Sequence, residues 1–265
     1  MAKKKYEEAN IQAIAETIRE KTGTEQTYKA SEMASGVSEV YDKGRTDEWS
    51  DFWDKYQEKG TKSQYLYSFA GHSWTDETFK PKHNISPSYS CQYMFTYSRI
   101  TDLAGILKRQ NVTLNLSRAN SVASAFQYCD KLTNLPEINL SGITSAGNAN
   151  MLFDSATSLE TIEKLVFSNT SGINYAYAFK SCTKLKNVVF EGRVTRSIDL
   201  HWSSSLSVES MKSLIACLED YSTASTGVYT VTFNDDCWEA LEADSSAPDG
   251  KTWREYVETT LGWLT

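Results

Sequence analysis

Apolar side chains recur at helical spacing in the N-terminal part of the chain and predict three short amphipathic helices. Ile11, Ile14 and Ile18 share one face of the first helix. The third helix carries an aromatic stripe formed by Trp49, Phe52, Trp53 and Tyr56. The three predicted helices span residues 7–21, 31–43 and 46–59. Because such apolar faces are unfavourable for isolated helices in water, we expect them to be covered by one another, by the repeat domain or by further copies of the chain.

The segment that follows, residues 61–90, has neither helical nor strand periodicity. Glycines and prolines interrupt short aromatic pieces such as Tyr65 to Phe69, which predicts an irregular connector. His72 and His83 lie in this segment without a spaced set of cysteines or acids, so they indicate hydrogen-bonded loop residues and not metal ligands.

Phenylalanine then recurs at nearly constant spacing. Phe95, Phe126, Phe153 and Phe179 are 31, 27 and 26 residues apart, a period typical of repeat proteins. In the last three units a small residue follows at +3, Leu at +6 and an aliphatic residue at +9. These units contain Phe126, Cys129, Leu132 and Leu135; Phe153, Ala156, Leu159 and Ile162; and Phe179, Cys182, Leu185 and Val188. In the first unit the pattern is one residue shorter. The corresponding residues are Ser98, Ile100 and Leu103, at +3, +5 and +8 from Phe95.

This period predicts a solenoid in which each unit forms one turn and covers the apolar face of the next turn. The Phe, the small residue and the Leu of each unit should then form three buried columns. The alternating pairs Ile138/Leu140 and Leu165/Phe167 predict a short strand in each turn. Cys129 and Cys182 would lie two turns apart, so no disulfide is expected between them.

The C-terminal part of the chain predicts a cap on the end of the repeats. Ser207 is the expected N-cap of a helix that extends to Asp220, and residues 226–233 alternate as a strand. The chain is therefore divided into a helical attachment or oligomerisation segment, a connector, a repeat domain and a C-terminal cap. Their predicted bounds are residues 1–60, 61–90, 91–205 and 206–265.

The repeats resemble those of BspA-type leucine-rich-repeat proteins. Two segments carry the resemblance, Phe126-Gln-Tyr-Cys-Asp-Lys-Leu-Thr-Asn-Leu135 and Phe179-Lys-Ser-Cys-Thr-Lys-Leu-Lys-Asn-Val188. The stretch from Asn10 to Gly23 and the closing segment from Leu206 to Leu264 are similar to phage and prophage tail proteins of gut Firmicutes. The resemblance implies an α/β repeat fold: a leucine-rich-repeat-like solenoid with short strands, preceded by a small helical segment and closed by an α/β cap.

The same resemblance implies a receptor-binding or adhesion protein of a phage tail or baseplate, without catalysis. Its expected partners are a bacterial surface glycan or protein, other tail proteins bound through the N-terminal helices, and further copies of the chain, with a trimer favoured because tail fibres are commonly trimeric. The expected location is the virion, after production in the host cytoplasm. A BspA-type bacterial adhesin or scaffold and a capsule depolymerase are the alternatives.

Composition and charge narrow the classes of function. Acidic side chains outnumber basic ones by 34 to 27, so no basic stripe is available for nucleic acid. No long apolar run predicts a membrane span, and no apolar stretch of a signal peptide follows the first ten residues. The five cysteines form no CxxC pair, and the common nucleotide, zinc-hydrolase and esterase motifs are absent from the sequence. We therefore expect buried structural thiols, no metal, no cofactor and no catalytic residues.

Candidate receptor-binding residues are polar and aromatic side chains beside the repeat phenylalanines. Tyr97 and Tyr128 lie two positions after a Phe, and Asp154 lies one position after the next Phe. A site that accepts Tyr, Ser or an acid is predicted to face solvent. Lys180 and His201 complete the candidate set. By contrast, Tyr175 and Tyr177 are predicted to belong to the core. Trp202 is either a core residue that closes the repeats, which is the favoured interpretation, or an exposed stacking platform.

Overall fold

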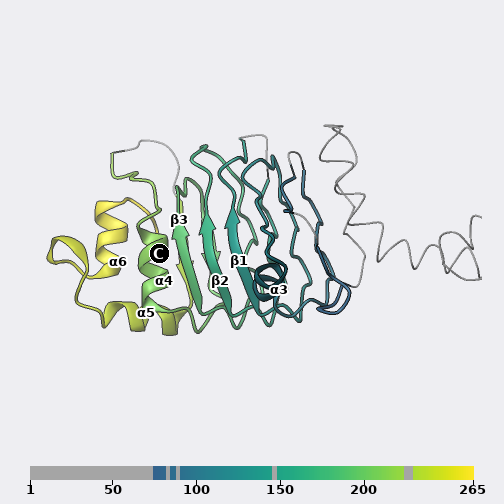
Figure 1. Ribbon diagram of the computed structural model, residues 1–265. Helices are drawn as coiled ribbons and strands as arrows, with labels where there is room; N and C mark the ends of the chain where they lie inside the picture. Colours follow the sequence, from purple (N-terminus) through teal and green to yellow (C-terminus); the bar gives the residue numbers. More distant parts are fainter. Residues whose placement is uncertain (1–73, 82–83, 88–89, 145–147, 224–228) are drawn as a thin grey trace, which may run out of the picture. The chain divides into compact units, whose positions relative to one another are not determined.

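The computed structural model of the protein describes residues 74–81, 84–87, 90–144, 148–223 and 229–265 (Figure 1). The predicted helices of residues 1–60 lie outside the described residues. The described elements are α3 (Leu103–Gln110), β1 (Asn134–Asn139), β2 (Thr161–Val166), β3 (Asn187–Glu191), β4 (Ile198–Leu200), α4 (Val208–Ile215), β5 (Val231–Phe233), α5 (Asp235–Glu242), a 3-10 turn (Pro248–Gly250) and α6 (Trp253–Glu255), which continues into a π-helical turn (Tyr256–Thr260).

Strands β1, β2 and β3 form a parallel sheet in chain order, and each strand comes from one repeat unit (Figure 1). Asn134 pairs with Thr161, and Thr161 pairs with Asn187, so the register follows the spacing of the phenylalanines. Leu135 and Ile138 of β1 are buried, as are their partners in β2. A strand is confirmed in each of these two units, but β1 and β2 begin earlier than Ile138 and Leu165 and end one residue before Leu140 and Phe167.

A second ladder of backbone hydrogen bonds joins the same units at the phenylalanines. The Phe95 amide donates to the Ala125 carbonyl at 2.7 Å, and the Phe126 and Phe153 amides bond equivalent carbonyls one unit further along the chain. The units of β1, β2 and β3 are therefore joined to one another along two separate edges. Parallel bridges outside the named strands, such as Ser90 with Ser121 and Asn148 with Asn174, have the same direction.

The core consists of the columns that the repeat pattern predicts. All nine side chains of the three columns are buried. Phe95 and Phe126 stack with ring centroids 5.2 Å apart, Phe126 and Phe153 stack at 5.7 Å, and Phe153 meets Phe179 at 5.5 Å. The phenylalanine column is confirmed, and the predicted burial of the small residues and the leucines is confirmed as well.

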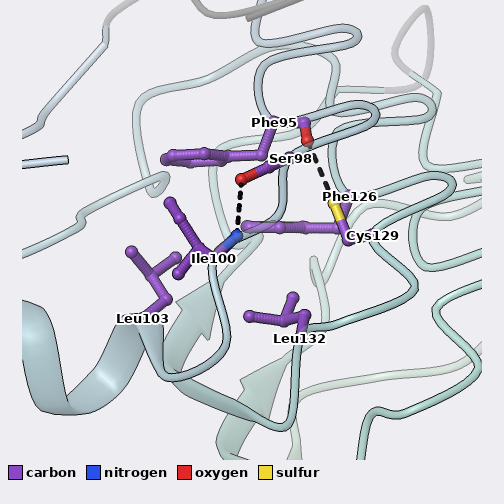
Figure 2. Close-up of a pocket in the computed structure, with 7 residues that line it drawn as sticks. All are labelled: Phe95, Ser98, Ile100, Leu103, Phe126, Cys129 and Leu132. Carbon is purple, nitrogen blue, oxygen red and sulfur yellow. Dashed lines mark hydrogen bonds between the residues drawn. The ribbon is translucent and has the colours of Figure 1, made fainter. Parts of the chain in front are cut away.

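Figure 2 shows the space between the first two turns, where Phe95 and Phe126 lie face to face above Leu132. The Cys129 thiol donates to the Phe95 carbonyl at 3.0 Å, and the Ile100 amide donates to the Ser98 hydroxyl at 3.3 Å. No volume here could admit a water molecule. This space is therefore a packed part of the core and not a ligand site.

A helix takes the place of a strand in the first repeat unit. Asp102 makes a single parallel bridge with Asn134 and then caps α3 by accepting from the Gly105 amide at 2.9 Å. Leu103, assigned by the pattern to a repeat step, is the first residue of this helix. The inserted helix accounts for the longer spacing between Phe95 and Phe126.

Helix α4 lies along the outer edge of β3, as α3 lies beside β1 at the other edge of the sheet (Figure 1). The Val188 amide donates to the Ser210 hydroxyl at 2.8 Å, and the Phe190 amide donates to the Ser213 hydroxyl at 3.1 Å. Ser207 is the N-cap, as predicted, and accepts from the Ser210 amide. The helix ends at Ile215, before the predicted end at Asp220.

The chain beyond α4 forms the rest of the C-terminal cap. Its backbone pairs with the preceding turn through the bridge between Val194 and Leu218, which explains the early end of the helix. Strands β4 and β5 pair in parallel, and Trp238 and Trp263 are buried beside them. The Trp263 indole donates to the Glu219 carbonyl at 2.7 Å. Residues 224–228, which include the start of the predicted strand, lie outside the described residues.

The described chain thus combines small open sheets with short helices, and its units stack at the period of the repeat phenylalanines. We propose that residues 91–205 constitute a leucine-rich-repeat-like solenoid closed by residues 206–265. The two hydrogen-bond ladders and the phenylalanine column support this interpretation.

Candidate functional site

Left-handed backbone conformations occur on both sides of every repeat phenylalanine. Of the ten residues other than glycine that have positive φ in the described part, eight lie two positions before or after a repeat Phe. They are Tyr93, Ser124, Met151 and Tyr177 before the Phe, and Tyr97, Tyr128, Ser155 and Ser181 after it. This conformation is unfavourable for side chains larger than Gly. Its repetition in each turn shows that the stacked fold imposes it.

The residues at the +2 position include a stacked pair of exposed tyrosines. The rings of Tyr97 and Tyr128 are 4.9 Å apart between centroids and only 11° from parallel. Their side chains are 60% and 41% exposed. The Tyr97 amide donates to the Gln127 carbonyl at 3.1 Å, and the Tyr128 amide donates to the Asp154 carbonyl at 2.8 Å. The ladder that stacks the core therefore also fixes the backbone of this aromatic pair.

The two tyrosines border an open hollow of about 580 Å³, which we call the tyrosine hollow. Its lining comes from the same positions of three successive turns, together with Lys131. The lining residues are Tyr97 and Arg99, Tyr128 and Asp130, and Ser155 and Thr157, at +2 and +4 from Phe95, Phe126 and Phe153. Lys131 Nζ lies 3.4 Å from a carboxylate oxygen of Asp130. The hollow thus offers aromatic faces, hydroxyl groups and charges of both signs.

The structure brings Tyr97 and Tyr128 together as exposed residues but does not expose Asp154. Only 5% of Asp154 is accessible, so the prediction that it faces solvent is wrong. Its carboxylate accepts from the Gln127 side-chain amide at 2.8 Å and from the Ser155 hydroxyl at 3.0 Å. The +1 side chains of the first three units are all buried, whereas the +2 tyrosines are exposed. Asp154 therefore contacts the hollow through its hydrogen bond with the lining residue Ser155 and does not line the hollow itself.

Lys180 and His201 lie apart from the hollow lining. Lys180 is exposed, and its ammonium group lies 5.6 Å from the ring centroid of Tyr177. His201 is partly exposed, with Nδ1 2.6 Å from Asp199 Oδ1 and its ring 4.6 Å from that of Trp202. The five candidate residues consequently do not form one site.

Two of the three aromatic residues assigned to the core are exposed. Tyr175 is buried, as predicted, but Tyr177 is 58% exposed and Trp202 is 41% exposed. Tyr177 has a φ of 57°, so the chain turns there and interrupts the strand-like alternation on which the prediction rested. Trp202 lies beside His201 at the surface instead of closing the core.

Sequence reasoning missed the charged and hydroxyl residues at +4, Arg99, Asp130 and Thr157. Their chemical types differ from turn to turn, so they gave no repeat signal by themselves. The signal that could have found them is their constant distance from each Phe, which places them beside the +2 tyrosines on the same edge.

The cysteines have the properties of structural thiols. All five are buried, and Cys129 and Cys182 are free thiols, as predicted. Burial raises the pKa of the Cys129 thiol to about 12. It also raises the pKa of Cys182, whose thiol donates to the Phe153 carbonyl at 3.2 Å. A thiol with a raised pKa is a poor nucleophile at neutral pH.

Within the described residues, no group of three or more His, Cys, Asp or Glu side chains is placed to hold a metal ion. No helix in that part of the chain is long and apolar enough to cross a membrane. Comparison of the chain with protein-family models, with curated proteins and with solved structures finds no match.

Proposed function

We propose that the chain is a non-enzymatic receptor-binding protein of a phage tail or baseplate, which recognises a bacterial surface glycan through its repeat domain. The observation that carries this proposal is the tyrosine hollow, where two exposed aromatic rings and several polar groups lie on a backbone fixed by inter-turn hydrogen bonds. Exposed aromatic residues on a rigid scaffold are typical of recognition surfaces. The tail context rests on the resemblance of the N-terminal and closing segments to tail proteins.

In this proposal the N-terminal segment attaches the protein to other tail proteins and joins copies of the chain, with a trimer favoured. The repeats then present the hollow to the host surface. The protein is located in the virion after synthesis in the host cytoplasm. A locus without tail, holin or lysin genes would contradict the tail assignment.

The binding role is tested with fluorescently labelled full-length protein and cells of gut Firmicutes. Wild-type protein should bind the cells, and the double variant Tyr97→Asn/Tyr128→Asn should lose affinity by at least about tenfold, because aromatic anchors dominate binding energy. Asn is chosen because it tolerates the left-handed backbone.

The matched control is Tyr177→Asn. Tyr177 has nearly the same exposure and φ as Tyr97 but does not line the hollow. Equal cell binding by wild type and by the double variant, with both folded by near-ultraviolet circular dichroism, would contradict the assignment of the hollow. Failure of the wild type to bind any Firmicutes cell wall would contradict the proposed function itself.

A further inference from the structure

Arg99 is a charged residue of the tyrosine hollow without an ionic partner in the described part of the chain. Its backbone is fixed, because the Arg99 amide donates to the Trp74 carbonyl at 2.7 Å, while its side chain is exposed. Several basic side chains elsewhere are paired instead: Arg193 with Glu219, Lys212 with Asp244, and Lys164 with Glu137 and Glu191.

The other two charges of the hollow offset each other. Asp130 and Lys131 carry opposite charges 3.4 Å apart, so together they add no net charge to the hollow. The hollow therefore keeps one uncompensated positive charge, that of Arg99, on a protein whose net charge is −7. A guanidinium group is planar and donates two parallel hydrogen bonds to a carboxylate or phosphate.

The rest of the lining is suited to a sugar ring. The Tyr97 and Tyr128 rings stack on each other, so an outer face of the stack provides the flat apolar surface for the C–H face of a pyranose. The hydroxyls of Ser155 and Thr157 can exchange hydrogen bonds with sugar hydroxyls. The volume of about 580 Å³ lies within the range of small-molecule sites.

We propose that the tyrosine hollow binds an acidic saccharide, with the sugar ring against the tyrosine pair and its carboxylate or phosphate group on Arg99. This inference rests on the proposed recognition function and specifies the ligand class of the same site. Because Arg99 alone makes the charge contact, one anionic group per sugar unit is enough for a ligand to occupy the hollow with its charge paired.

Isothermal titration calorimetry on the full-length protein tests the inference with three probes: tetragalacturonate as a carboxylated ligand, phosphomannan oligosaccharide as a phosphorylated ligand, and maltotetraose as a neutral ligand. At least one acidic probe should bind about tenfold or more tightly than maltotetraose, because a hydrogen bond between charged groups contributes more than a neutral one. The stronger of the two acidic probes identifies the carboxylate or the phosphate as the preferred group.

The decisive variant is Arg99→Gln, with Arg118→Gln as the matched control, since Arg118 is also outside the core but does not line the hollow. Arg99→Gln should reduce the affinity for the acidic probe to that for maltotetraose, and Arg118→Gln should leave it unchanged. Equal affinity for acidic and neutral probes, unchanged acidic affinity in Arg99→Gln, or no binding of any probe would overturn the inference. The proposed function would survive each of these results if cell binding still depended on Tyr97 and Tyr128.

Discussion

At the scale of the residue, backbone with positive φ serves two different purposes. Tyr97 and Tyr128 adopt it on the exposed edge, whereas Gly192 adopts it, with a φ of 89°, directly after β3. A Cβ at Gly192 would overlap the Phe167 carbonyl oxygen and lie 2.9 Å from the carbonyl carbon. Gly192 is therefore required both for its conformation and for the close approach of two turns.

We expect Gly192→Ala to lower the free energy of unfolding substantially more than Gly250→Ala. Gly250 also has a positive φ, of 66°, but nothing lies within 4 Å of an added Cβ. The control substitution should cost about 1 kcal/mol from conformation alone, and the overlap adds to this at Gly192. Urea denaturation of both variants measures the difference. Equal losses would show that the turns can separate at Phe167 without cost.

The core residues were predictable from the sequence, but the edge residues were only partly so. The columns of Phe, of small residues and of Leu follow from the repeat period alone, because an apolar side chain in each turn must be covered by the next turn. Tyr97 and Tyr128 were found because their position accepts residues of different polarity. Asp154 was assigned wrongly because it was grouped with the +2 tyrosines, whereas it lies at +1, and the +1 side chains of the first three units are buried. The left-handed turn at the next residue, Ser155, leaves no hydrophobic pattern that separates the two positions.

At the scale of the element, one carboxylate of the cap is hydrogen-bonded to two helices, α4 and α6. Asp244 follows α5 and accepts from Lys212 Nζ of α4 at 2.7 Å. Its other donors are the Ser246 hydroxyl and amide and the Trp253 indole of α6, at 3.4 Å for the indole. The hydrogen bond from Lys212, followed by those from Ser246, holds the pKa of the Asp244 carboxyl well below its usual range.

This lowered pKa predicts an acid-sensitive cap. The contribution of Asp244 to stability is complete above the pKa of an unfolded Asp, about 3.9, and is lost as the pH falls from there toward the folded pKa. Asp244→Asn should therefore lower the melting temperature at pH 6, and its difference from wild type should shrink as the pH falls below 4. The exposed Asp249→Asn serves as control. A difference that stays constant down to pH 2.5 would contradict this linkage.

The local sequence predicted some helix bounds correctly and others not. Ser207 was recognised as an N-cap because a small polar residue precedes a helical apolar stripe. Helix α3 was missed because Leu103 fitted the repeat pattern, which concealed the helical spacing of Leu103, Ile106 and Leu107. The end of α4 was placed too late because the residues after it are apolar up to Leu218, yet their backbone pairs with the preceding turn. Pairing between turns is a tertiary effect that the local pattern does not contain.

At the scale of the whole molecule, stability depends on contacts between neighbouring turns. Leu159 lies in the central unit between the turns of Leu132 and Leu185, and its side chain is fully buried. Leu159→Ala should cost about 2–5 kcal/mol, because it leaves a cavity between two turns. Hydrogen exchange should show increased opening of the β1 and β3 amides as well as those of β2, since each turn is stabilised by its neighbours.

Val189→Ala is the control for this prediction, because Val189 lies on β3 with its side chain exposed. It should change the stability by no more than about 0.5 kcal/mol. Increased exchange confined to β2 in Leu159→Ala would mean that the turns do not stabilise one another. That result would remove the main support for the solenoid interpretation.

The serine hydroxyls of α4 that bond the edge of β3 have a consequence for the length of the protein. They occupy the backbone groups to which another strand would add, so the sheet ends at a defined chemical boundary. A whole unit inserted or deleted between β1 and β3 leaves this boundary intact. The repeat region can thus be lengthened or shortened in steps of about 4.8 Å, the distance between neighbouring strands, without a new terminus. The number of repeat units can therefore change while the structure that ends the sheet stays the same.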